Sequence, residues 1–133
     1  MFNGTIKLEM AQRLRNLISL DLSYNSLSVG TSGNHSSWSS FSKISRLMLA
    51  SCHLTVFPNL KNQSKLVYLD LSDNEIHGKV PNWIWEVGNG SLIYLNLSRN
   101  YLEGMQEPYK LPSFLTTLDL HSNHMQGKIP ALP

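Results

Sequence analysis

The sequence lacks the features that mark disulfide-rich, membrane and nucleic-acid-binding proteins. It has one cysteine, Cys52, in 133 residues, so a disulfide-stapled scaffold is excluded. The N-terminal segment has no apolar run of signal-peptide length, and no stretch reaches the ~18–20 apolar residues of a membrane span. As written, the chain is not expected to enter the secretory pathway by a visible signal or to cross a bilayer. Only 15% of the residues are charged and no basic run occurs, which disfavours a nucleic-acid partner.

One phrase of the form L-x-x-L-x-L-x-x-N-x-L recurs five times, with close substitutes at some positions. Its second leucine stands at positions 20, 47, 69, 95 and 118, so successive copies lie 27, 22, 26 and 23 residues apart. All four spacings fall within the 20–29 residue period of a leucine-rich repeat. The copies are Leu17–Leu27, Ile44–Leu54, Leu66–Ile76, Leu92–Leu102 and Leu115–Met125.

The phrase predicts one short strand per repeat, because L-x-L places both leucines on one face and the intervening residue on the other. Stacked copies bury a continuous leucine core. We therefore expect an α/β-type solenoid, a single array over residues 1–133 of about five repeats. Parallel strands would form the concave face, near residues 18–24, 45–51, 67–73, 93–99 and 116–122. Loops, turns and short 3₁₀ or helical segments would form the convex side, with residues 28–40 as an inserted Ser/Gly-rich loop.

Asparagine recurs at the point where each strand ends and the chain turns. A buried amide at this point can satisfy the backbone groups that the turn leaves without partners. Cysteine replaces asparagine once, and a small buried thiol fits that slot far better than a reactive nucleophile does. The predicted structural ladder comprises Asn25, Cys52, Asn74, Asn100 and Asn123.

A second phrase, G-x-I-P or a variant of it, follows some copies. It reads Gly78, Val80, Pro81 in one repeat and Gly127, Ile129, Pro130 in another. The phrase is incomplete after Leu102, where Glu107 stands in place of proline, so we do not expect regular geometry there. The combined pattern L-x-x-L-x-L-S-x-N-x-L-x-G-x-I-P resembles the plant-specific class of leucine-rich repeat. LDLSDNEIHGKVPNWIWEVGNGSLIYLNLSRNYLEG and LDLHSNHMQGKIPALP are similar to the ectodomain of plant receptor-like proteins of the Verticillium-wilt-resistance type.

That resemblance implies an internal ectodomain fragment of a cell-surface immune receptor. It implies a glycoprotein at the plasma membrane, on the extracellular face, which binds a peptide or protein ligand and signals in plant defence through a receptor kinase co-receptor. The membrane connection would come only through family segments that this chain does not contain. Two alternatives stay open: an extracellular inhibitor of a cell-wall-degrading enzyme, and a non-functional receptor gene fragment.

The residues between the leucines are candidates for ligand binding. One exposed column reads Ser19, Arg46, Tyr68, Tyr94, Thr117, and tyrosine beside arginine is typical of interaction hot spots. A central column reads Asp21, Met48, Asp70, Asn96, Asp119, for which we expect solvation of the surface rather than acid–base chemistry. The predicted concave ligand-binding residues are Arg46, Tyr68, Tyr94, Asp70, Asp119 and Arg99.

No catalytic residue, metal site or cofactor is predicted. His121 and His124 are expected to face different directions, and Asp119, His121 and Ser122 are triad residue types whose positions on one strand should prevent a relay. Trp83 and Trp85 lie between strands, where a short helical or 3₁₀ turn should pack one ring against the core and leave the other partly exposed.

Five N-x-S/T sequons are candidate glycosylation sites. Their number is mild support for a parent protein that passes through the secretory pathway. They stand at Asn3, Asn34, Asn62, Asn89 and Asn96.

Overall fold

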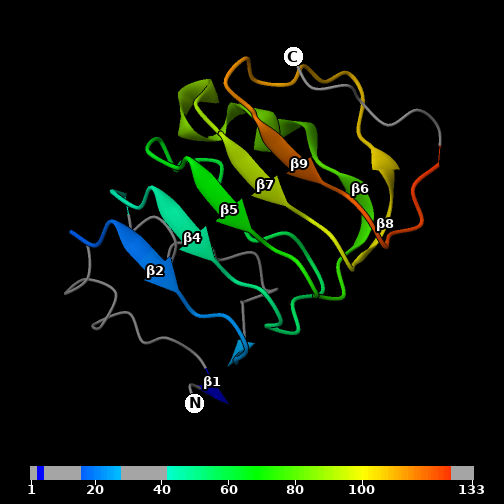
Figure 1. The fold of residues 1–133 in the computed structure, drawn as a ribbon, viewed down its shortest axis with the longest axis horizontal. Coiled ribbons are helices and arrows are strands. Elements are labelled where there is room, and N and C mark those ends of the chain that lie inside the picture. The colour runs from blue at the N-terminus through cyan, green and yellow to red at the C-terminus, as the bar shows by residue number, and fades with distance from the viewer. Residues whose placement is uncertain (1–2, 5–15, 28–41, 127–133) are drawn as a thin grey trace.

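The computed structural model describes residues 3–4, 16–27 and 42–126, with side chains from 16 to 26 and from 42 onward. Its main sheet is parallel and has the strand order β2-β4-β5-β7-β9, as Figure 1 shows. The strands contain three residues each and lie inside the five expected ranges: β2 is Ser19–Asp21, β4 is Arg46–Met48, β5 is Tyr68–Asp70, β7 is Tyr94–Asn96 and β9 is Thr117–Asp119. The predicted fold class, a leucine-rich-repeat solenoid, is confirmed.

Each strand pairs with the next repeat in the register that the repeat phrase requires. Leu47 pairs with Leu69 and Leu69 with Leu95, and all three are at most 1% exposed. Leu20 and Leu118 occupy the two edge strands and are only partly buried. The alternation of more exposed and buried residues along the inner strands β4, β5 and β7 therefore separates the outer face of the sheet from a leucine core.

The strands are short because the chain turns directly after them. The residue before each ladder position has φ between 54° and 64°, in the left-handed region, and none of these residues is glycine. The ladder side chain that follows binds backbone carbonyls of the turn, which holds this conformation in place. The left-handed residues are Tyr24, Ser51, Asp73, Arg99 and Ser122.

Two smaller sheets of two strands each accompany the main sheet. β6 is His77–Val80 and pairs in parallel with β8, Tyr101–Met105, while β1, Asn3–Gly4, pairs with β3, Ser26–Leu27. β6 ends directly before Pro81, as expected for a residue without an N–H. β8 pairs with β6 as far as Met105, but the register shifts where Gly78 pairs with Leu102 and Lys79 with Gly104. The pairing is therefore irregular at Glu103, in the repeat whose second phrase is incomplete.

The convex side carries η1, a 3₁₀ segment over Asn82–Gly90 that lies behind the main sheet in Figure 1. Trp85 is 3% exposed and Trp83 is partly buried, which confirms the packing predicted for the two rings. Gly88 lies at a kink inside η1, at φ 63°, and a Cβ there would lie 2.0 Å from the Leu66 carbonyl oxygen. Only glycine fits this close backbone approach.

No helix in the described residues is long and apolar enough to cross a bilayer. The predicted loop 28–40 and the second phrase at Gly127, Ile129 and Pro130 lie outside the described residues.

Candidate ligand-binding surface

The face of the main sheet that points away from the core is the concave face of the solenoid. Its first column places Tyr68 between Arg46 and Tyr94 in the strand register. The two tyrosine rings lie 5.7 Å apart between centroids and are tilted by 39°, and Tyr68 is 43% exposed. The Arg46 guanidinium donates a hydrogen bond to Ser19 Oγ at 3.3 Å. These side chains occupy consecutive positions of one column; two of them are exposed and Tyr94 is partly buried. We call this column the tyrosine strip: Arg46, Tyr68 and Tyr94.

The central column has a structural role that sequence analysis missed. Each polar side chain in it accepts a hydrogen bond from the backbone N–H two residues later, at 3.0, 2.9, 3.0 and 3.1 Å in the order of the chain. Such local bonds cap the strand end and stabilise the turn. The recurring motif Asp-Leu-Ser in the sequence could have indicated these caps. The capping residues are Asp21, Asp70, Asn96 and Asp119.

Met48 is the exception in the central column, because a thioether cannot cap the turn in this way. The Ala50 N–H instead donates to the hydroxyl of Ser23 in the preceding repeat, at 3.1 Å.

The cap at Asp21 also holds the pKa of that carboxyl below its usual value, because the backbone N–H and the hydroxyl of Ser23 both donate to it.

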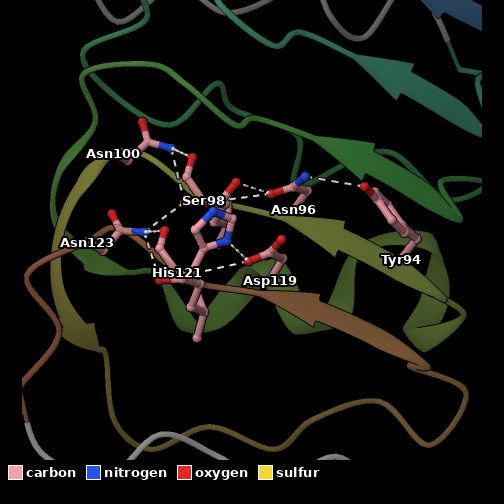
Figure 2. A network of polar contacts seen from close by, with 9 residues as sticks. Tyr94, Asn96, Ser98, Asn100, Asp119, His121 and Asn123 are labelled. Atoms are coloured by element: carbon pink, nitrogen blue, oxygen red, sulfur yellow. Dashed lines mark hydrogen bonds and ion pairs between the residues drawn. The ribbon is translucent and has the colours of Figure 1, made fainter.

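Asp119 and His121 form a close side-chain pair at the end of β9, with Nδ1 of His121 2.5 Å from Oδ1 of Asp119. Figure 2 shows this contact beside the Asn96–Ser98 pair of the preceding repeat. Partial burial works to raise the pKa of Asp119, but the hydrogen bonds from the His121 side chain and backbone and the positive charge of Arg99 outweigh it. The pKa of Asp119 is therefore below its ordinary value.

Asp119 and His121 are in contact although they are close in sequence, because the turn after β9 brings the imidazole back to the carboxylate. Ser122 has the left-handed φ of 58°. Within the described residues no hydroxyl hydrogen-bonds to the His121 ring, so the pair does not extend to a nucleophile. His124 stacks on Tyr101 at a centroid distance of 6.0 Å, away from His121. The two histidines therefore have separate partners.

The asparagine ladder behind this face links successive repeats by hydrogen bonds. Asn100 Nδ2 donates to the carbonyls of Leu97 at 3.1 Å and of Leu71, one repeat earlier, at 3.0 Å, and Asn123 bridges its repeats in the same way (Figure 2). Cys52 is fully buried, and its thiol donates to the Leu22 carbonyl at 3.1 Å. Burial raises the pKa of Cys52, so the thiol fits the structural role predicted for it.

The remaining sequence candidates lie at several places. Arg99 is exposed in the turn after β7, near Asp119. Asn62 and Asn89 are exposed, whereas Asn96 is partly buried and its amide donates to the Tyr94 hydroxyl at 3.3 Å. Asn34 and the Asn3 side chain lie outside the described part of the chain. Glycosylation at these sequons stays a prediction.

Comparison with known proteins identifies the repeat. The family profile described as Leucine Rich Repeat matches residues 16–42, 65–87 and 114–133. The chain belongs to the leucine-rich-repeat family. It is 38% identical over 122 residues to Receptor-like protein 54 of Arabidopsis thaliana, and 38% identical over 135 residues to Receptor like protein 23. These matches cover 90% and 96% of this chain but only 14% of either relative, so the chain spans a small part of the length of its relatives.

Solved structures of plant receptor ectodomains have the same fold. The ectodomain of the Arabidopsis receptor kinase HAESA, in complex with an IDA peptide hormone ligand, superposes with a TM-score of 0.73 at 29% identity. That match covers 96% of this chain and 21% of HAESA. The plant peptide hormone receptor RGFR1 in complex with RGF2 gives a TM-score of 0.67 at 25% identity, over 92% of this chain and 23% of that receptor. The leucine-rich-repeat ectodomain family is non-catalytic.

Proposed function

We propose that this chain is part of the ectodomain of a plant receptor-like protein of the Verticillium-wilt-resistance type, and that its concave face binds a peptide or protein ligand. The whole protein would lie in the plasma membrane with this array outside the cell, and would act in plant defence through a receptor kinase co-receptor. The names of the relatives support this, as does the structural neighbour solved with HAESA, the IDA peptide and the co-receptor SERK1.

The tyrosine strip is the observation that carries the proposal. Tyr68 and Tyr94 are large amphipathic rings held 5.7 Å apart on rigid strands, so a ligand can contact both at little cost in conformational entropy. Arg46 adds a positive charge at one end of the strip. Asp70 uses one carboxylate oxygen for its cap, which leaves the other as an acceptor for a ligand N–H.

Phage display tests the proposal although the natural ligand is unidentified. A random peptide library is selected against the immobilised chain, and the affinity of the selected peptides is measured on variants. We expect Tyr68→Ala or Tyr94→Ala to weaken binding by at least ~10-fold, as for a hot-spot residue.

The chain offers a matched control for this experiment. Tyr101 is 45% exposed, close to the 43% of Tyr68, but it lies on β8, in the β6–β8 sheet. Tyr101→Ala should leave the affinity unchanged. Selected peptides that depend on Tyr101 and not on Tyr68 would overturn the assignment of the concave face as the binding surface.

A further inference from the structure

A pocket of about 440 Å³ lies on the convex side, away from the tyrosine strip, where η1 meets the segment after β8. This volume is within the range of small-ligand sites, about 300–1,000 Å³. The pocket is lined by Asn82, Trp85, Glu86, Pro108, Tyr109 and Lys110.

The pocket exists because two adjacent repeats differ in their convex segments. The repeat from Leu69 to Leu95 includes the nine residues of η1, whereas the next repeat, from Leu95 to Leu118, is three residues shorter and has no helical segment. The shorter repeat leaves a hollow beside η1. Asn82 ties the two walls together, because its N–H donates to Gln106 Oε1 at 2.9 Å and its Nδ2 to the Pro108 carbonyl at 3.0 Å.

The lining combines aromatic rings with unpaired polar groups. Trp85 is 3% exposed, and its buried Nε1–H has no hydrogen-bond partner in the part of the chain that the structure describes. Because this atom is buried, it is not open to a ligand, and Trp85 contributes its ring to the wall of the pocket. Glu86 and Lys110 are both exposed, and neither forms an ion pair within the described residues.

This set of groups selects for a neutral, polyhydroxylated ligand. A ligand with a net charge would be attracted by one of Glu86 and Lys110 and repelled by the other, so its charge gains little, and an apolar ligand would desolvate both groups without compensation. A sugar hydroxyl both donates and accepts, and the C–H face of a sugar ring packs on an aromatic ring. We propose that the pocket binds the sugar residues of a neutral oligosaccharide, with Tyr109 as the aromatic contact, Glu86 as acceptor and Lys110 as donor.

The indole N–H signals test this directly. The chain has three tryptophans, Trp38, Trp83 and Trp85, so a ¹⁵N-labelled sample has three indole N–H signals, and Trp85→Phe identifies the one from the pocket. Cellotetraose and the core pentasaccharide of N-glycans are titrated separately to about 10 mM, a range that reveals millimolar affinity. We expect the Trp85 signal to shift with at least one of them while the Trp83 signal stays in place.

Matched charge variants show whether the sugar binds in the pocket. Glu86→Gln combined with Lys110→Gln should weaken the binding by at least ~10-fold, since both exposed groups can be changed without loss of packing. Glu103→Gln combined with Lys79→Gln, on the β6–β8 sheet, should leave it unchanged. A shift with cellotetraose alone indicates a β-glucan as the source, and one with the pentasaccharide alone indicates a glycoprotein. No shift with either sugar, or equal binding by both double variants, would overturn the proposal.

Discussion

Replacing Asn74 by alanine should destabilise the array more than any substitution of a surface residue. Asn74 is 6% exposed, and its side chain makes five hydrogen bonds to the backbone. Its Oδ1 accepts from two N–H groups of the preceding repeat, at 2.9 and 3.0 Å, and its Nδ2 donates to three carbonyls, at 2.9 to 3.0 Å. The partners are the N–H groups of Cys52 and Leu54 and the carbonyls of Leu49, Leu71 and Ser72.

The two N–H groups that lose their acceptor determine how much the free energy of unfolding falls. Each buried donor left without a partner costs about 1–3 kcal/mol, so Asn74→Ala should lower the free energy of unfolding by about 2–6 kcal/mol. A domain of this size is typically stable by about 5–15 kcal/mol, so the loss is a large fraction of the total. Urea unfolding followed by circular dichroism measures it.

Two control variants make this measurement decisive. Asn74→Cys should have an intermediate effect, because the Cys52 thiol occupies the equivalent slot and still donates to backbone carbonyls. Asn62→Ala removes an exposed asparagine and should change stability by no more than about 0.5 kcal/mol. A loss below about 1 kcal/mol for Asn74→Ala, similar to that of Asn62→Ala, would refute the idea that the ladder holds the repeats together.

Three further predictions concern the core, the strand caps and the thiol. Leu69→Ala should cost ~2–5 kcal/mol of unfolding free energy and Asp70→Ala only ~0.5–1.5 kcal/mol for its lost cap; equal losses in urea unfolding would contradict the register. Because the pKa of Asp119 is lower in the folded state, its carboxylate stabilises the fold above about pH 4, its unfolded pKa, and this contribution is lost as the pH falls through the folded pKa. The stability difference between the wild type and Asp119→Asn should therefore shrink in acid melts, and a difference that grew would be inconsistent. Cys52 should not react with Ellman's reagent until the chain unfolds, and rapid native labelling would show that the thiol is accessible.

The arrangement of the main sheet could be predicted because it follows from a leucine pattern that repeats along the sequence. Alternation at L-x-L determines which residues are buried, and the recurrence of the same phrase in each repeat determines the register. The repeat pattern alone therefore places Tyr68 between Arg46 and Tyr94. The ladder could be predicted for the same reason, since a turn at the same point in each repeat leaves the same backbone groups to be satisfied.

What could not be predicted depends on local geometry that has no period in the sequence. The capping by Asp70 and the contact of Asp119 with His121 arise from the turn after the strand, whose left-handed residue is not a glycine and so gave no signal. The pocket beside η1 depends on a difference in length between two repeats. The sequence contains that difference, but the side chains that line the resulting space come from segments 22 or more residues apart.

Site-specific photo-crosslinking tests the central claim, ligand recognition by the tyrosine strip, most directly. The photoreactive amino acid p-benzoylphenylalanine is placed at Tyr68 in one sample and at Tyr101 in another, and each is irradiated with a peptide selected from the library. We expect a covalent adduct, located by mass spectrometry, at position 68 and none at position 101. An adduct at position 101 with none at 68 would contradict recognition by the concave face.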